Sequence, residues 1–199
     1  MTLSIYSPAS EWYNYNIKYR RCGKSGIHLL EKYLGLWHNF GDVNTFSNSQ
    51  AMAHYVFNHS ITHFDLAYNY DPSYDSAEET FGLPREKSFM PYRNELFIST
   101  KAKHDMWPGS YGEWNTRKSL KASLSQGLKR MDLDYTDIFY SHRYAPGTPL
   151  EETRCILSAL SGTSQPFNRE PEQEGILQHH LHYRRTGRNK PYLSEISNN

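Results

Sequence analysis

Segments typical of β-strands and of α-helices alternate along the chain between residues 30 and 160, and this alternation limits the fold more than any other feature. Short runs of apolar, β-branched and aromatic residues, such as 61–67 and 96–100, are each followed by a segment with helical signals. The linkers between these segments are short enough for crossover connections. The chain is therefore expected to fold as an α/β domain with a parallel sheet, into which about four β/α units fit.

The individual elements follow from local patterns. The clearest helix is 116–133, in which Leu120, Leu124 and Leu128 recur at helical spacing with basic residues between them. The turn-forming residues of "CGKSG" at 22–26 predict an N-terminal β-hairpin before the first unit. Further helices are expected near 44–59, 76–82 and 148–160, and strands near 33–37, 61–67, 96–101 and 135–142.

Composition divides the chain into three segments. Residues 1–18 form a polar and aromatic N-terminal arm, and residues 19–160 carry the hairpin and the β/α units. Residues 161–199 are rich in Pro, Gln, Glu and Asn, with almost no apolar periodicity. Such a segment is expected to be an irregular polar C-terminal tail.

Charge and cysteine content restrict the partners and the compartment. The formal net charge is +1 at pH 7 with His neutral, so we expect no basic surface for nucleic acid and none for an anionic membrane. No apolar run approaches the length of a membrane span. Two cysteines make no disulfide framework, and Cys155, among apolar residues of a helix, is expected to be buried. These features favour a soluble cytoplasmic protein.

Four residues with useful chemistry fall at or just beyond the carboxyl ends of the expected strands, where parallel α/β folds gather their reactive groups. They are Asp65, Tyr70, Lys101 and His142. A lysine ammonium favours the phenolate of a nearby tyrosine, and an aspartate can hold that ammonium in place. A histidine could orient a carbonyl oxygen or relay a proton. Together they could protonate an oxygen while a cofactor delivers hydride to its carbon.

Two other motifs have simpler explanations. The "GKS" at 23–25 mimics the end of a phosphate-binding loop, but that motif needs a glycine where Lys18 stands. We interpret it as a hairpin turn. His59, His63 and Asp65 suggest a metal site, but one histidine ends a helix and the other lies in a strand, so the helical spacing of paired ligands fails. No metal is expected.

The segments that carry the four candidate residues resemble the aldo-keto reductase family. "SITHFDLAYNY" at 60–70 is similar to the family's strand and loop with the catalytic acid and tyrosine. "ELFISTK" at 95–101 and "DYTDIFYSHR" at 134–143 follow in family order, with similar separations. The resemblance covers roughly Tyr19 to Thr153. It is closest to the branch of bacterial glyceraldehyde-3-phosphate/methylglyoxal reductases and potassium-channel β subunits.

The resemblance implies a fold, a cofactor and a reaction. The fold is a (β/α)₈ TIM barrel, the cofactor is NADPH, and the reaction reduces a small aldehyde or ketone to an alcohol. The four residues above would form the catalytic tetrad, with Tyr70 as the proton donor. Gly35 and Trp37, both in "LGLW", would lie at the cofactor site together with Asp65.

The chain departs from the family after residue 160. A complete barrel usually needs about 250 residues, so only a partial barrel of about four units is expected. The family's later units bind the nicotinamide and grip the 2′-phosphate, and none is recognisable between residues 160 and 191. "KPYLSEISNN" at 190–199 resembles the family's fifth strand and implies Ser197 and Asn198 as contacts to the nicotinamide amide. A truncated or frame-shifted gene would explain the loss of pattern.

Three functional hypotheses stay open at this point. The chain is an active reductase, an NADPH-binding regulatory subunit with little turnover, or an inactive truncated fragment. Half a barrel exposes two sheet edges, which promote assembly. A homo-oligomer that closes the sheet is therefore an open alternative for the quaternary structure.

Overall fold

An antiparallel hairpin precedes the main sheet in the computed structural model. The structure describes residues 6–13, 17–70, 73, 75–84, 88–102, 105–113, 115–160, 180–181, 184–186, 190–192 and 195–196. Strand β1 (Tyr19–Arg21) pairs with β2 (His28–Leu30), and the N–H of Cys22 donates to the carbonyl of Ile27 at 2.8 Å. The expected N-terminal hairpin is confirmed.

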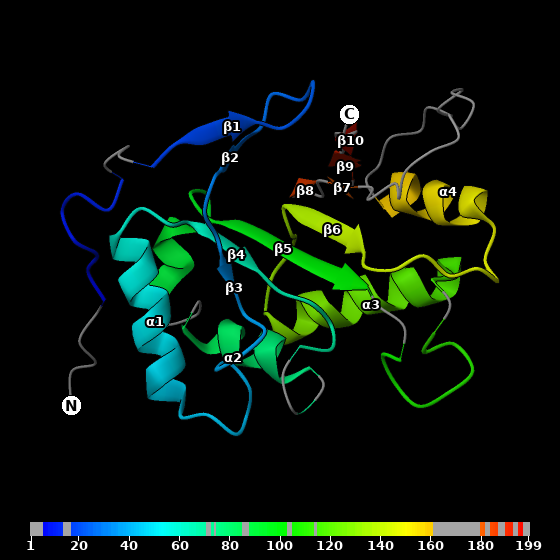
Figure 1. Cartoon of the computed structure of the whole chain (residues 1–199), viewed down its shortest axis with the longest axis horizontal. Helices are drawn as coiled ribbons and strands as arrows, with labels where there is room; N and C mark the ends of the chain where they lie inside the picture. The colour runs from blue at the N-terminus through cyan, green and yellow to red at the C-terminus, as the bar shows by residue number, and fades with distance from the viewer. Residues whose placement is uncertain are drawn as a thin grey trace.

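Four parallel strands follow one another in both sequence and space (Figure 1). They are β3 (Leu34–Gly35), β4 (His63–Asp65), β5 (Phe97–Ala102) and β6 (Ile138–Ser141). Each pairs in parallel with the next, as in the first half of a (β/α)₈ barrel. The expected α/β fold with a partial barrel is confirmed.

A helix follows each of these strands. These helices are α1 (Phe46–Asn58), α2 (Ser76–Pro84), α3 (Arg117–Arg130) and α4 (Leu150–Leu160), and a short 3₁₀ turn, η2 (Met90–Tyr92), precedes β5. Neighbouring helices contact one another in chain order. The four β/α units therefore stack side by side, which places the carboxyl ends of all four strands along one edge of the sheet.

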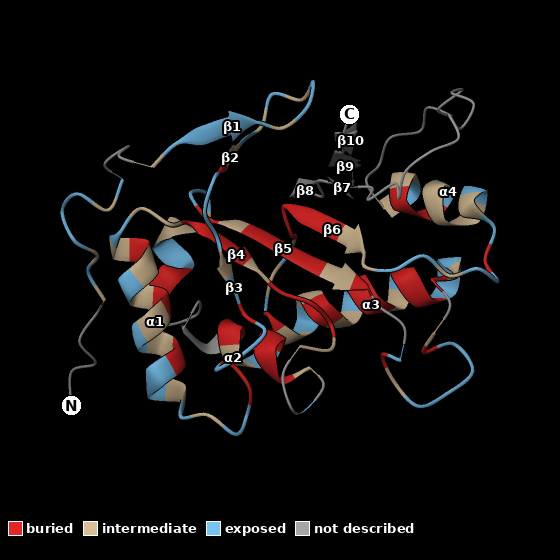
Figure 2. Ribbon diagram, viewed as in Figure 1, coloured by how far each residue is buried: buried red, intermediate tan, exposed pale blue. Residues whose placement is uncertain are grey.

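The core lies between the strands and the helices (Figure 2). One cluster of buried side chains joins α1 and α2 to β4 and β5, with Phe57, Phe64 and Phe81 among its largest members. A second cluster joins α3 and α4 to β5 and β6, around Leu120 and Phe139. Because successive side chains point to opposite faces of a sheet, the other residues of each strand line the face opposite these clusters.

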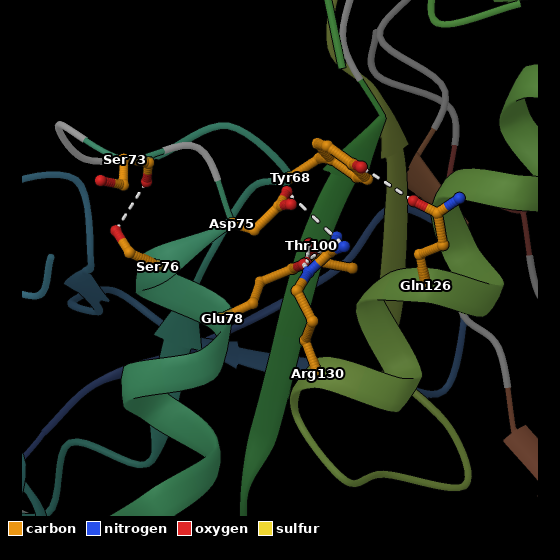
Figure 3. Close-up of polar contacts among 8 residues, drawn as sticks. All are labelled: Tyr68, Ser73, Asp75, Ser76, Glu78, Thr100, Gln126 and Arg130. Atoms are coloured by element: carbon orange, nitrogen blue, oxygen red, sulfur yellow. Dashed lines mark hydrogen bonds and ion pairs between the residues drawn. The ribbon is translucent and has the colours of Figure 1, made fainter. Parts of the chain in front are cut away.

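A buried ion pair joins α2 to α3 on the helical side of β5 (Figure 3). The carboxylate of Glu78, which is 1% exposed, accepts hydrogen bonds from Nε and Nη2 of Arg130 at 2.8 and 2.6 Å. It accepts a third from Oγ1 of Thr100 at 2.6 Å. The same guanidinium lies 4.2 Å above the ring of Tyr68 and 3.5 Å from the carboxylate of Asp75. The network ties both helices to the strand that carries Lys101.

Two glycines permit this close approach of the helices. A Cβ at Gly82 would lie 2.8 Å from the carbonyl oxygen of Arg130, and a Cβ at Gly127 would lie 2.8 Å from Oε1 of Glu78. Both distances are shorter than side chains tolerate. The glycines therefore set the separation at which Arg130 reaches Glu78.

The described parts of the tail form four strands of two or three residues. Strand β7 (His180–Leu181) pairs antiparallel with β6, and β10 (Glu195–Ile196) pairs antiparallel with β7. Strands β8 (Arg184–Thr186) and β9 (Lys190–Tyr192) form a separate pair. The expectation that 190–199 form a fifth parallel strand is wrong for the described residues. The place beside β6 is taken by β7, which runs antiparallel to it.

Two further sequence expectations can be compared with the structure. Cys155 is exposed on α4, so the expectation of a buried thiol is wrong; its neighbours Ile156 and Leu157 take the buried face. Among the described residues, no helix is both long enough and apolar enough to cross a bilayer.

Candidate active site

The four residues singled out in the sequence lie together at the carboxyl end of the sheet. Asp65 is the last residue of β4, and Tyr70 follows five residues later in the loop to α2. Lys101 lies near the end of β5, and His142 comes directly after β6. Three adjacent strands thus supply the group, which is possible because their parallel order brings their ends to one edge.

Asp65 and Lys101 form a close ion pair. Nζ of Lys101 donates to Oδ2 of Asp65 at 2.6 Å and to the carbonyl of Leu66 at 2.7 Å, and the two side chains are 11% and 14% exposed. Burial lowers the pKa of Lys101, whereas the neighbouring carboxylate raises it. The aspartate therefore both anchors the ammonium and favours its charged form, as the sequence suggested.

Tyr70 lies against this ion pair. Its ring centre is 4.8 Å from Nζ of Lys101, in a cation–π arrangement. Burial raises the pKa of Tyr70 above its ordinary value, and the charge of Asp65 and the nearby Tyr33 raise it further. The expectation that Lys101 lowers the pKa of this phenol is not met, because the ammonium is not among the causes of the shift and burial is the largest. The phenol therefore carries its proton, as a proton donor must.

Two more aromatic groups surround Tyr70. The ring of Trp37 lies nearly parallel to it with 6.0 Å between centres, and the ring of His142 meets it edge-on at 6.2 Å. Trp37 itself is 60% exposed. Gly35 lies directly opposite Asp65 in the β3–β4 pair, and a Cβ there would meet nothing within 4 Å. The open edge and the exposed indole leave room for a flat group beside the ion pair.

Sequence reasoning missed two polar side chains of this face. Oγ of Ser99 donates to Oδ1 of Asp65 at 2.5 Å, and the ring of Tyr140 lies 5.5 Å from Nζ of Lys101. Ser99 precedes Lys101 by two residues, and Tyr140 precedes His142 by two. The two-residue period of a strand could have found both, since it places such pairs on one face.

The structure describes only some of the remaining candidate residues. Ser197 and Asn198 lie outside the described residues. Within the described stretches, no three His, Cys, Asp or Glu side chains are close enough to hold a metal ion. The described site is built from the ion pair with Ser99 and Tyr140 beside it, and from Tyr70, His142, Trp37 and Gly35.

Comparisons with known proteins identify the class and then the family. A thermostable aldo-keto reductase crystallised with the inhibitor epalrestat matches 72% of this chain and 49% of its own, with a TM-score of 0.59 and 26% identity. The sheet and its helices thus define a protein built on the first half of a (β/α) barrel. The profile of the aldo/keto reductase family matches residues 33–162, and the chain belongs to this family.

Curated relatives fall in the branch that the motifs indicated. The L-glyceraldehyde 3-phosphate reductase of Escherichia coli K12 is 56% identical over 142 residues, which are 71% of this chain and 41% of that protein. A probable voltage-gated potassium channel subunit beta of Arabidopsis thaliana is 32% identical over 140 residues, 69% of this chain and 40% of its own. The chain thus spans about two fifths of the length of these relatives.

Proposed function

We propose that this chain carries the catalytic residues of an NADPH-dependent reductase that converts small aldehydes or ketones to alcohols. The observation that carries the proposal is the ion pair of Lys101 and Asp65, 2.6 Å apart, beside the half-buried and protonated phenol of Tyr70. Membership of the family and the similarity to a glyceraldehyde 3-phosphate reductase support the same class of reaction.

Each polar group of the site has a task in this reaction. NADPH, when bound, supplies hydride to the carbonyl carbon. Tyr70 donates its proton to the carbonyl oxygen as negative charge develops there, which completes the alcohol. The ammonium of Lys101 stabilises the phenolate that remains, and Asp65 holds this ammonium in place. His142 orients the carbonyl oxygen, and water then returns a proton to Tyr70.

Trp37 and Gly35 fit the cofactor. The exposed indole offers a flat face for the nicotinamide, and the missing side chain at residue 35 leaves space next to Asp65. A nicotinamide held by these two residues would supply hydride to the carbon of the carbonyl group whose oxygen Tyr70 protonates. A small aldehyde such as glyceraldehyde 3-phosphate is the proposed substrate, in line with the name of the bacterial relative.

The similarity to a channel β subunit favours a second candidate function. In this alternative the chain binds NADPH and regulates a partner, with little turnover. Saturable NADPH binding together with negligible aldehyde reduction would favour it over the reductase.

Replacing Tyr70 with Phe tests the proposed reaction. The matched control is Tyr144→Phe, because Tyr144 is 67% exposed in the loop before α4. We expect Tyr70→Phe to lower kcat for aldehyde reduction by roughly 10²–10⁴-fold, the contribution of a positioned acid. NADPH affinity, measured by nucleotide fluorescence, should stay within about twofold in both variants. A Tyr70→Phe protein with the wild-type rate would refute the assignment of the proton donor.

A further inference from the structure

A line of polar side chains extends from the ion pair toward the amino ends of the strands. His63 and Asp65 are two residues apart on β4 and share a face, and Ser99 of β5 lies directly opposite Asp65. Oγ of Ser99 lies 2.5 Å from Oδ1 of Asp65 and 3.1 Å from Nε2 of His63. Ser99 is fully buried and His63 is 6% exposed, so water does not compete for these bonds.

The hydroxyl of Ser99 is the junction of this line. A carboxylate only accepts hydrogen bonds, so Ser99 must donate its one proton to Asp65. Tyr140, on β6, carries a second hydroxyl that interacts with Ser99. With its proton already used, Ser99 can only accept a hydrogen bond from His63 or from any other partner. A hydroxyl oxygen has two lone pairs, so Ser99 has room to accept from His63 while it donates to Asp65.

This accounting fixes the form of His63. Its Nε2 must carry the ring proton, because Ser99 has none left to give. The other nitrogen, Nδ1, is therefore unprotonated, and it has no hydrogen-bond partner among the described residues. Burial lowers the pKa of His63 to about 4, so the ring is neutral at physiological pH. The rings of Phe97 and Tyr33, with centres at 5.0 and 5.3 Å, pack against it.

We propose that Ser99 is a positioning residue for the reductase site and that the direction of its hydrogen bond to Asp65 sets the tautomer of His63. Ser99 occupies Oδ1 of Asp65 and so leaves Oδ2 to face Lys101, the group that supports Tyr70. His63 completes the line, because its Nε2–H donates to the oxygen of Ser99. The role in turnover rests on the proposed function, whereas the hydrogen-bond directions do not.

The directions can be tested without turnover. In Tyr140→Phe the serine still donates to the carboxylate, and ¹⁵N NMR of labelled histidine should find the Nε2–H form of His63, as in the wild type. In Asp65→Asn/Tyr140→Phe the amide oxygen accepts from Lys101, and its NH₂ group donates to Ser99. The serine proton can then go only to Nε2 of His63, so the ring should switch to the Nδ1–H form.

Tyr140→Phe and the double variant differ only at residue 65, which is a carboxylate in the first and an amide in the second. A change of His63 tautomer between them therefore reports the direction of the Ser99 hydrogen bond. An Nδ1–H ring in the wild type, or an unchanged Nε2–H ring in the double variant, would overturn the proposal. Asp132→Asn, an exposed aspartate just after α3, is the control and should leave the signals of His63 unchanged.

Kinetics test the consequence for catalysis. Ser99→Ala should lower kcat by about ten- to hundredfold with little change in the KM for aldehyde, since misplacing a supporting group costs on this order. Ser99→Thr retains the hydroxyl and should restore most of the rate. If Ser99→Ala folds with the wild-type melting temperature and keeps its kcat, Ser99 has no positioning role. Absence of turnover in the wild type would instead count against the proposed function, while the NMR result still decides the hydrogen-bond directions.

Discussion

Removing Arg130 should destabilise the fold in a manner that depends on pH. Glu78 is almost completely buried and accepts three hydrogen bonds, two of them from the Arg130 guanidinium. Arg130→Met keeps most of the side-chain volume but leaves the carboxylate with only the hydroxyl of Thr100. Removing one partner of a buried ion pair costs about 3–5 kcal/mol. We therefore expect a loss of this order in the free energy of unfolding at pH 8.

The sign of the pH dependence follows from Glu78. Burial raises its pKa above the ordinary value, and Arg130 opposes that rise. A carboxyl group whose pKa is raised in the folded state favours folding below its unfolded pKa, and this contribution is lost as the pH rises through the folded pKa. Without Arg130 the folded pKa rises further, so protonation can relieve the unpaired charge. The deficit of Arg130→Met should therefore shrink between pH 8 and pH 5.

Urea unfolding followed by circular dichroism at several pH values measures this deficit. The matched control is Lys129→Met. Lys129 is exposed in the same last turn of α3, so its replacement removes the same interaction with the helix dipole. That control should stay within about 0.5 kcal/mol of the wild type. A deficit below about 1 kcal/mol at pH 8, or an equal deficit at pH 5 and pH 8, would refute the reasoning.

Two further predictions concern α3. Gly127→Ala should destabilise the protein by about 1–3 kcal/mol, because the new Cβ would meet the Glu78 carboxylate, whereas Gly147→Ala has open space and should be near neutral in chemical denaturation. An Ala at 127 that stabilises, as in an exposed helix, would contradict the close approach of α2 and α3. Thr116→Ala should cost about 0.5–2 kcal/mol, since its side chain accepts from the N–H of Ser119 at the start of α3. Thr45→Ala at the start of α1 is its control, because Thr45 makes no such bond; equal melting temperatures for the two variants would contradict this.

The main elements were predictable because their signals are local. Apolar runs located β4 and β5, and helical spacing located α3, so the rule for parallel strands could place Asp65 and Lys101 at one edge of the sheet. The motifs around these two residues also indicated the family. Local pattern and motif thus sufficed for the fold of residues 19–160.

Features that depend on contacts between distant segments were harder to predict. Whether burial or the ammonium dominates the pKa of Tyr70 depends on packing around its loop. Cys155 shares an apolar helix with Ile156 and Leu157, but successive helical residues point about 100° apart, so the neighbours could be buried while the thiol is exposed. The strands of the tail have no apolar pattern of their own; β7 forms on the edge that β6 offers.

Transfer of a labelled hydride tests the central claim most directly. Purified chain would be incubated with NADPH deuterated at the transferable position and with glyceraldehyde 3-phosphate, and the alcohol product analysed by mass spectrometry. The account predicts one deuterium on the carbinol carbon of the product, and a product yield that falls in Tyr70→Phe but not in Tyr144→Phe. Bound NADPH with no deuterated alcohol, or equal yields from Tyr70→Phe and the wild type, would contradict it.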